Sequence, residues 1–287
     1  MPKNETRGAG TLRLGGDLEV NRLGFGAMRL CGPGVWGELD DPGTSGRVLR
    51  RAVDLGVNFI DTADAYGPGV SEERISSALH PYPEELVIAT KGGYTRQGPS
   101  RWRTNGRPKH LREACEGSLR RLKLDRIDLY QLHRPDSRVP FEGTIEALAR
   151  LREEGKLRHV GLSNVTAEQL AVAAGIVPIV SVQNRYNLND RRSEEVLLAC
   201  ERAEIAFIPW LPLGTGRLAR PGGKLLETAA RHGATVPQVA LAWLLAKSPV
   251  TLPIPGTSSV EHLEENVAAG EIRLAAEQVK ALTRLKP

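Results

Sequence analysis

Short apolar runs alternate with longer stretches of helical periodicity along most of the chain. The runs are rich in branched residues and end at polar turns, which is typical of buried parallel strands, and the stretches between them supply the crossover helices that parallel strands require. Strands are expected over 22–28, 57–60, 86–90, 127–132, 158–162, 180–183, 205–210 and 251–254. Helices are expected over roughly 45–55, 71–80, 108–122, 141–154, 225–231 and 237–247, and capping patterns at Thr166 and Ser258 open two more.

Eight strand–helix units predict an α/β protein of one domain over residues 1–287, folded as a (β/α)8 TIM barrel. The segments 11–14 and 18–20 flank a Gly-Gly-Asp turn and predict an N-terminal β-hairpin, and extra helices are expected at the C-terminal end. An open doubly wound sheet is the alternative. The glycine patterns that begin at Gly24 and Gly214 lack the strand–turn–helix context of a dinucleotide fingerprint, so they do not favour that alternative.

Four polar side chains follow three successive predicted strands. Asp61 and, five residues later, Tyr66 follow the second strand, Lys91 ends the third and His133 ends the fourth. The carboxyl ends of parallel strands share one face of a barrel, so these groups are expected together. Taken singly, each has a structural alternative: a loop anchor, a pocket wall, a solvated strand end or a core histidine. Asp64 is expected to make only loop or capping hydrogen bonds.

Together the four groups suit carbonyl reduction, which needs a proton donor and polar groups that stabilise charge on the oxygen. An isolated tyrosine has a pKa near ~10, and a neighbouring ammonium lowers it. The pattern therefore predicts Tyr66 as acid, Lys91 as the group that tunes it, Asp61 as the anchor of Lys91, and His133 as the group that orients the carbonyl. A hydride must come from a cofactor.

The segments 61–67, 90–93, 132–135 and 161–164 resemble the signature segments of the aldo-keto reductases in order and approximate spacing, and the resemblance runs from about residue 22 to 266. It places the family's catalytic tetrad on Asp61, Tyr66, Lys91 and His133. It implies an NAD(P)H-dependent reductase of aldehydes or ketones, with NADPH as the expected cofactor and NADH as the alternative. A regulatory NADP(H)-binding barrel with little turnover is the competing function.

The resemblance also implies where the cofactor lies. Carboxamide contacts are expected from the ends of strands five and six, ring stacking from Trp210, and adenosine contacts from the segment 254–266. Stricter NADPH users often carry Lys and Arg where this chain has Gly256 and His262. The full expected set is Gly26, Met28, Ser163, Asn164, Gln183, Trp210, Leu211, Pro212, Leu213, Gly214, Gly216, Arg217, Gly256, Thr257, Ser258, His262, Glu265 and Asn266.

Two tryptophans are expected to line the substrate pocket, because Trp36 and Trp102 fall in loops on the presumed mouth of the barrel. Packing within those loops is the alternative. The segments 26–37 and 256–259 resemble the bacterial pyridoxal-reductase-like branch, which suggests pyridoxal or another small aromatic carbonyl as substrate.

Arg101 and Arg103 flank Trp102 in a stretch without acidic residues and are expected to help capture an anionic ligand. A solvated basic loop is the competing interpretation.

Composition narrows the remaining classes. The 287 residues are 40% hydrophobic and 25% charged, with net charge +5, which is ordinary for a soluble globular protein. Cys31, Cys115 and Cys200 have no paired spacing, so neither a disulfide framework nor a zinc site is expected, and a reducing, cytoplasmic setting is favoured. The start of the chain has no secretory pattern. We expect no metal, no nucleic-acid or membrane partner, and a monomer or weak homo-oligomer.

Overall fold

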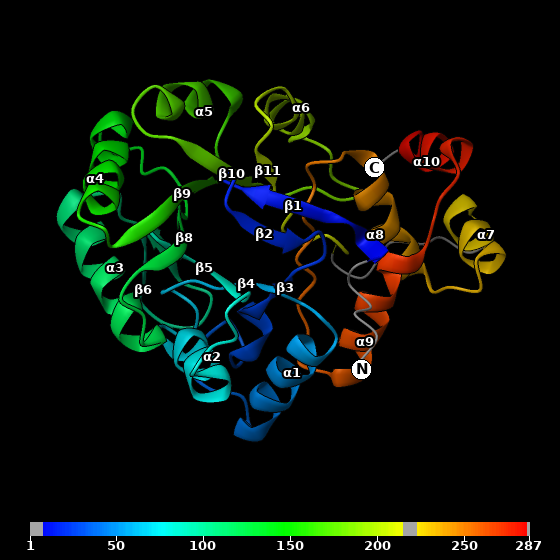
Figure 1. Ribbon diagram of the computed structural model, residues 1–287, viewed down its shortest axis with the longest axis horizontal. Helices are drawn as coiled ribbons and strands as arrows, with labels where there is room; N and C mark the ends of the chain where they lie inside the picture. The colour runs from blue at the N-terminus through cyan, green and yellow to red at the C-terminus, as the bar shows by residue number, and fades with distance from the viewer. Residues whose placement is uncertain (1–7, 215–222, 286–287) are drawn as a thin grey trace.

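The structure is a computed structural model that describes residues 8–214 and 223–285. Its centre is a parallel sheet ringed by helices (Figure 1). The seven strands lie in the order β11-β10-β9-β8-β5-β4-β3, so all but one pair of neighbours in the sheet are consecutive parallel strands of the chain. Their bounds are β3 (Phe25–Gly26), β4 (Phe59–Asp61), β5 (Val87–Gly92), β8 (Ile127–Leu132), β9 (Leu157–Ser163), β10 (Ile179–Gln183) and β11 (Ala206–Phe207).

Most helices cover the outer surface of the sheet with one apolar side, whereas the residues of α8 from Val239 to Leu244 are buried all round. In α3, for example, Leu111, Cys115 and Leu122 are buried while basic residues face outwards. Capping boxes start α5 at Thr166 and α8 at Thr235. The helices are α1 (Pro42–Asp54), α2 (Val70–Leu79), α3 (Pro108–Leu122), α4 (Phe141–Glu153), α5 (Ala167–Ala174), α6 (Glu194–Arg202), α7 (Lys224–Arg231), α8 (Val236–Lys247), α9 (Val260–Ala268) and α10 (Ala276–Thr283), with 3-10 turns η2 (Ala27–Leu30) and η3 (Ala269–Glu271).

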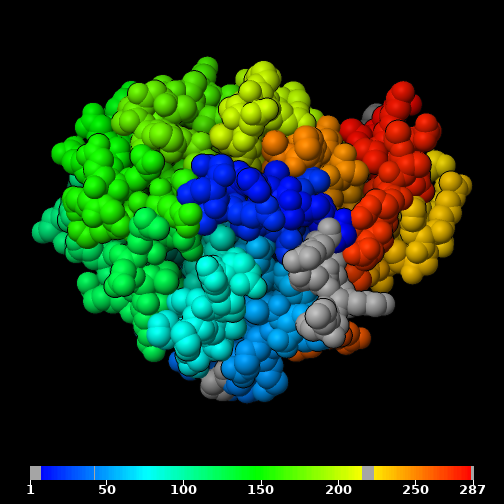
Figure 2. Space-filling model, in the orientation of Figure 1, coloured from blue at the N-terminus to red at the C-terminus, as the bar shows by residue number. Residues whose placement is uncertain are grey.

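The predicted N-terminal hairpin is present as β1 (Thr11–Leu14) and β2 (Leu18–Asn21). Its Leu14, Leu18 and Val20 pack on residues from the interior of the sheet, and Asp17 is bonded to Arg158 near the start of β9. The hairpin therefore closes the end of the sheet where the strands begin. Figures 1 and 2 show it lying across the middle of that face. The catalytic candidates are at the opposite end, where the strands finish.

The eighth strand of the predicted barrel is the main departure. Residues 251–254 form only an isolated bridge, Phe207↔Thr251, and no strand. Backbone hydrogen bonds nevertheless run from this segment to both edges of the sheet: Leu252 N donates to Phe207 O at 2.9 Å and Gly24 N donates to Pro253 O at 3.0 Å. Pro253 and Pro255 have no N–H to donate, which explains why a regular ladder does not form. The parallel sheet and most of its helices are thus as predicted, but no helix was predicted at 194–202, where α6 lies, and a complete eight-stranded barrel is not seen in the described residues.

The stretch after Lys91 also differs from the long loop expected there. It contains a second hairpin, β6 (Tyr94–Arg96) paired with β7 (Trp102–Thr104), closed by a turn around Gly98. Tyr94, Arg96, Trp102 and Thr104 share one face because they occupy alternate, directly paired positions, whereas Thr95 and Arg103 occupy the other face. This two-faced hairpin rises from the end of the sheet that carries the catalytic candidates.

Candidate active site

The Asp61–Lys91 pair forms the floor of the site. Lys91 Nζ lies 2.5 Å from Asp61 Oδ1 and 2.8 Å from the carbonyl oxygen of Thr62, and the Lys91 side chain is fully buried. The other Asp61 oxygen accepts hydrogen bonds from the side-chain amides of Gln131 at 3.0 Å and Gln183 at 2.8 Å. Burial lowers the pKa of Lys91, while the Asp61 charge opposes that shift. The carboxylate is therefore what keeps an ammonium in this position.

Tyr66 lies in the loop that follows β4, with its ring centroid 5.3 Å from Lys91 Nζ. The sequence predicted a pKa of Tyr66 lowered by Lys91, but the net shift in the structure is upward. Burial raises the pKa of Tyr66 well above its ordinary value, and the nearby Asp61 charge adds to the effect. Because Asp61 neutralises much of the field of Lys91, Tyr66 remains a protonated phenol with a hydrogen to donate.

His133 directly follows β8 and lies against the aromatic side chains. Its ring centroid is 5.8 Å from that of Tyr66, 4.6 Å from that of Tyr94 and 6.3 Å from that of Trp102. Burial first, and then the charge of Lys91, lower the pKa of His133 well below its usual value. The imidazole is therefore neutral and carries one N–H. Its Nδ1 is buried without a hydrogen-bond partner in the described part of the chain.

Two hollows meet at these groups. One, of about 250 Å³, includes nine of the residues expected to bind the cofactor along its wall, together with Asp61 and Tyr66. The other, of about 420 Å³, reaches His133 and Trp102, and the two share Met28, Tyr66, Gln183 and Trp210. The two hollows adjoin along these four residues and are together called the cleft below. The nine residues of the first hollow are Gly26, Met28, Gln183, Trp210, Leu211, Pro212, Leu213, Gly214 and Gly256.

Asn164 connects the strands beneath the second hollow. Its φ of 60° places it in the left-handed region, where asparagine is better tolerated than most residues. The side-chain amide donates to His133 O and to Ser163 Oγ, both at 3.0 Å, and its oxygen accepts from Trp210 Nε1 at 3.2 Å. Ser163, Asn164 and Trp210 are therefore held in a fixed relation to His133.

Residues 257–266 of the expected adenosine segment lie outside both hollows, whereas residues 254–256 line the smaller one. Ser259, one residue after the predicted Ser258, caps α9 by accepting from His262 N at 3.3 Å, and it donates its own N–H to Thr257 Oγ1 at 3.0 Å. Ser258 and His262 are exposed, Glu265 is partly buried, and Thr257 and Asn266 are buried. Gly216 and Arg217 lie outside the described residues.

The predicted substrate tryptophans have different surroundings. Trp102 lines the larger hollow, with its ring 6.3 Å from that of Tyr66. Trp36 lines neither hollow. The central carbon of the Arg96 guanidinium lies 5.6 Å from the centroid of the Trp36 ring. Sequence reasoning missed four residues around the cleft: Arg29, Tyr94 and Arg134, which line it, and Arg96 behind Trp102. Tyr94 could have been identified from the sequence, because it stands only three residues after Lys91.

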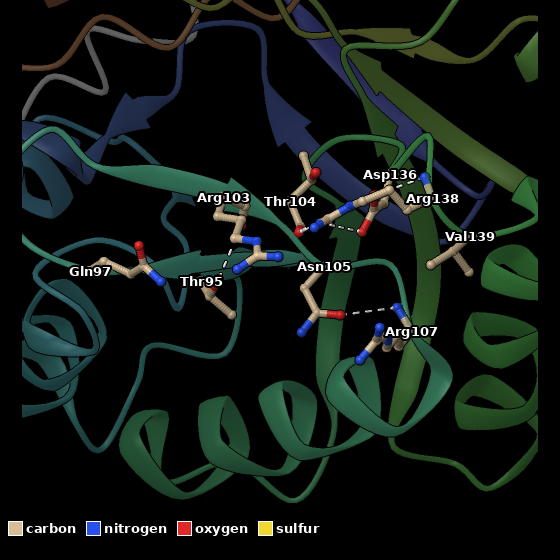
Figure 3. A pocket seen from close by; sticks show the side chains of 9 residues that line it. All are labelled: Thr95, Gln97, Arg103, Thr104, Asn105, Arg107, Asp136, Arg138 and Val139. Carbon is tan, nitrogen blue, oxygen red and sulfur yellow. Dashed lines mark hydrogen bonds and ion pairs between the residues drawn. The ribbon is translucent and has the colours of Figure 1, made fainter.

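Arg103 faces away from this cleft. It lines a separate hollow of about 200 Å³ on the outer side of the β6–β7 hairpin, shown in Figure 3. Arg138 lines the same hollow but is already engaged, because it pairs with the buried Asp136 at 2.9 Å and donates to the carbonyl of Thr104. The sequence predicted that Arg101 and Arg103 help to capture an anionic ligand without taking part in the chemistry. Arg103 lines no part of the cleft, so such an effect can come only from its electric field.

Within the described residues, no group of three or more His, Cys, Asp or Glu side chains is arranged to hold a metal ion. Likewise, no helix in residues 8–214 or 223–285 is long and apolar enough to cross a membrane. The fold and the cleft thus define an α/β protein whose acid–base groups gather at the carboxyl ends of parallel strands.

The sequence matches the profile of the Aldo/keto reductase family over residues 22–287. It is 50% identical over 269 residues to an uncharacterised oxidoreductase of Schizosaccharomyces pombe, covering 94% of this chain and 87% of that protein. It is 45% identical over 273 residues to the pyridoxine 4-dehydrogenase of Escherichia coli K12, covering 93% and 95%.

Solved structures agree with these sequence matches. A glycerol dehydrogenase from Gluconobacter oxydans superposes with a TM-score of 0.86 at 26% identity, over 96% of this chain and 94% of that one. An aldo-keto reductase from Klebsiella pneumoniae in complex with NADPH gives 0.80 at 29% identity, over 96% and 95%. The chain belongs to the aldo-keto reductase family, and it is an NAD(P)H-dependent oxidoreductase.

Proposed function

We propose that this protein reduces a small aldehyde or ketone to an alcohol with NADPH, and that Tyr66 gives the proton. One observation carries the proposal. The Tyr66 phenol and the His133 imidazole both face the cleft, edge to face at 5.8 Å, while the Asp61–Lys91 pair lies directly beneath. A carbonyl oxygen that enters the cleft between these rings would meet two neutral hydrogen-bond donors.

The residues around the smaller hollow suit a nicotinamide dinucleotide. Trp210 offers a half-buried ring beside Tyr66, and Leu211 and Gly214 have φ values of 55° and 63°, which turn the backbone along the wall. When bound, NADPH would supply the hydride. We assign the nicotinamide end to Ser163, Asn164, Gln183 and Trp210, the backbone beside the phosphates to 211–214, and the adenosine end to the start of α9.

The chain's own groups then have distinct tasks. His133 donates its N–H to the substrate oxygen and fixes its position, because a neutral imidazole donates from only one ring nitrogen. Tyr66 releases its proton to the same oxygen as negative charge develops there. Lys91 stabilises the resulting phenolate, and Asp61 holds Lys91 charged in a buried position. Trp102 and Tyr94 form an apolar wall beside these groups.

Aromatic walls favour a planar substrate. Tyr94, Trp102 and Trp210 line the larger hollow, and Arg134 adds a positive charge to its wall. These surroundings, together with the likeness to a pyridoxine 4-dehydrogenase, support pyridoxal or another small aromatic carbonyl.

A carbonyl panel tests the proposal. The purified protein is given NADPH with pyridoxal, benzaldehyde, an aliphatic aldehyde of similar size and glyceraldehyde, and the loss of nicotinamide absorbance is followed. We expect turnover with the aromatic carbonyls and a lower KM for them than for the aliphatic ones. Tight NADPH binding without turnover on any carbonyl would instead favour a regulatory subunit.

The preference between cofactors is tested by fluorescence titration. We expect NADPH to bind more tightly than NADH, because Thr257, Ser258 and the first N–H groups of α9 can donate to a 2′-phosphate. The double variant Thr257→Ala, Ser258→Ala should then have a smaller difference between its affinities for NADPH and NADH. Equal affinities for the two cofactors in the parent protein would refute the assignment of this segment.

A further inference from the structure

Arg96 ties together three segments that surround the catalytic tyrosine. From the first strand of the β6–β7 hairpin, its Nη1 donates to the carbonyl oxygens of Val35 and Ala65, both at 2.8 Å. Its Nη2 donates to the carbonyl oxygen of Gly34 at 2.8 Å. Val35 and Gly34 belong to the loop after η2, and Ala65 is the residue directly before Tyr66.

The same guanidinium supports the wall of the substrate hollow. Its central carbon lies 3.7 Å from the ring centroid of Trp102, on the opposite strand of the hairpin, which is a close cation–π stack. Trp102 in turn lies at 6.3 Å from both Tyr66 and His133, measured between ring centroids. A displacement of Arg96 would therefore move the aromatic wall relative to both reacting side chains.

The segments that Arg96 joins are also linked in pairs by backbone hydrogen bonds. Gly37 N donates to Gly67 O at 2.9 Å, Gly67 N donates to Val35 O at 3.3 Å, and Ser100 N donates to Gly34 O at 2.9 Å. These bonds align the loops in pairs, whereas Arg96 contacts all three segments at once. Because no regular strand continues through the Tyr66 loop, its position depends on such contacts.

We propose that Arg96 is a positioning residue for the reaction: its guanidinium sets the Tyr66 loop and the Trp102 wall at the spacing that proton transfer needs. This inference rests on the proposed carbonyl reduction. It requires an arginine, because only the planar fork can bond to several carbonyls and stack on an indole at the same time. A lysine at this position would keep the charge and lose both the fork and the stack.

A matched pair of variants tests the proposal. Arg22 is a similar clamp at the opposite end of the sheet, where its Nη2 donates to the carbonyls of Leu245 at 2.8 Å and Ser248 at 2.6 Å, far from the catalytic groups. Arg96→Lys and Arg22→Lys are compared for kcat, KM, NADPH affinity and thermal midpoint. We expect Arg96→Lys to lower kcat/KM by about tenfold to a hundredfold, the scale of a small misplacement of reacting groups, with kcat reduced and KM raised.

Three further expectations make the comparison decisive. Arg22→Lys should leave kcat and KM within about twofold of the parent even if its thermal midpoint falls, because Arg22 bonds to the backbone at the end of the sheet opposite the cleft. NADPH affinity should change little in either variant. The loss in Arg96→Ala should be partly restored by millimolar guanidinium and not by sodium or methylammonium at the same ionic strength.

The results separate the two claims. If the parent reduces carbonyls and Arg96→Lys matches it, or if both lysine variants lose activity in proportion to their thermal midpoints, Arg96 has no positioning role. If the parent reduces no carbonyl, the proposed function fails and this inference fails with it. Selective loss in the Arg96 variants with rescue by guanidinium supports the assignment even where they are less stable.

Discussion

At the scale of single residues, the buried Asp61–Lys91 pair couples stability to function. Lys91 supplies a charge that Asp61 needs, since a carboxylate is costly to bury without a counter-charge. We expect Lys91→Met to abolish most turnover and to lower the free energy of unfolding by about 3–5 kcal/mol, because it leaves an unpaired buried charge. Adding Asp61→Asn should recover part of that stability without recovering activity. Urea unfolding of the parent, both single variants and the double variant measures these free energies of unfolding. If the losses of the two single variants simply add in the double variant, the two side chains do not stabilise each other.

His133 gives the site a pH-dependent stability. Its pKa is lowered from an ordinary value of 6.5 by burial and by Lys91, so the unfolded chain binds a proton that the folded protein does not. Stability from this group is therefore complete above pH ~6.5 and is lost as the pH falls below that value. We expect His133→Asn to flatten the fall in thermal midpoint between about pH 7 and pH 5. A parallel pH dependence in parent and variant would show that His133 is not the group responsible.

The positions of the four catalytic candidates could be predicted from the sequence, but their ionisation could not. A carboxylate, a phenol, an ammonium and an imidazole at strand ends indicate where they meet. Whether Lys91 or burial dominates the pKa of Tyr66 depends on Asp61 lying 2.5 Å from the ammonium and on the exclusion of water. Both properties depend on how the chain packs in three dimensions, and the spacing of residues along the sequence does not reveal this.

At the scale of elements, the β6–β7 hairpin separates two kinds of surface. Its inner face carries Tyr94, Arg96 and Trp102 towards the cleft, and its outer face carries Arg103 into another hollow. The sequence predicted a long loop between Lys91 and the helix near Pro108, and the two strands found there have only three residues each. Strand pairing across such a turn is decided by contacts with the rest of the protein.

Arg101 and Arg103 give a prediction at this scale. Both side chains are exposed, so they can attract an anionic ligand only through their field. We expect Arg101→Gln with Arg103→Gln to raise KM for NADPH at low ionic strength, with kcat unchanged and with the difference vanishing at high salt. Lys280→Gln with Arg284→Gln removes the same charge from α10 and should have a smaller effect. Equal effects of the two pairs would show that only net charge matters.

At the scale of the whole molecule, alternation of strands and helices was sufficient to predict the parallel sheet, most of its surrounding helices and the end that bears the site, although α6 was not predicted. The eighth strand was not predictable in this way. Residues 251–254 look like a strand by their branched side chains, but Pro253 and Pro255 reduce the segment to a few hydrogen bonds between β11 and β3. The cleft likewise depends on many separate segments of the chain, whose mutual packing no local pattern specifies.

The central claim is that this fold positions Tyr66 as the proton donor in NADPH-dependent carbonyl reduction, and Tyr66→Phe tests it most directly. The variant keeps the ring and its contacts with Trp102 and His133 while removing only the hydroxyl. With the best carbonyl from the panel, we expect kcat to fall at least about a hundredfold, the usual contribution of a general acid, with NADPH affinity nearly unchanged. Turnover close to that of the parent protein would contradict the account.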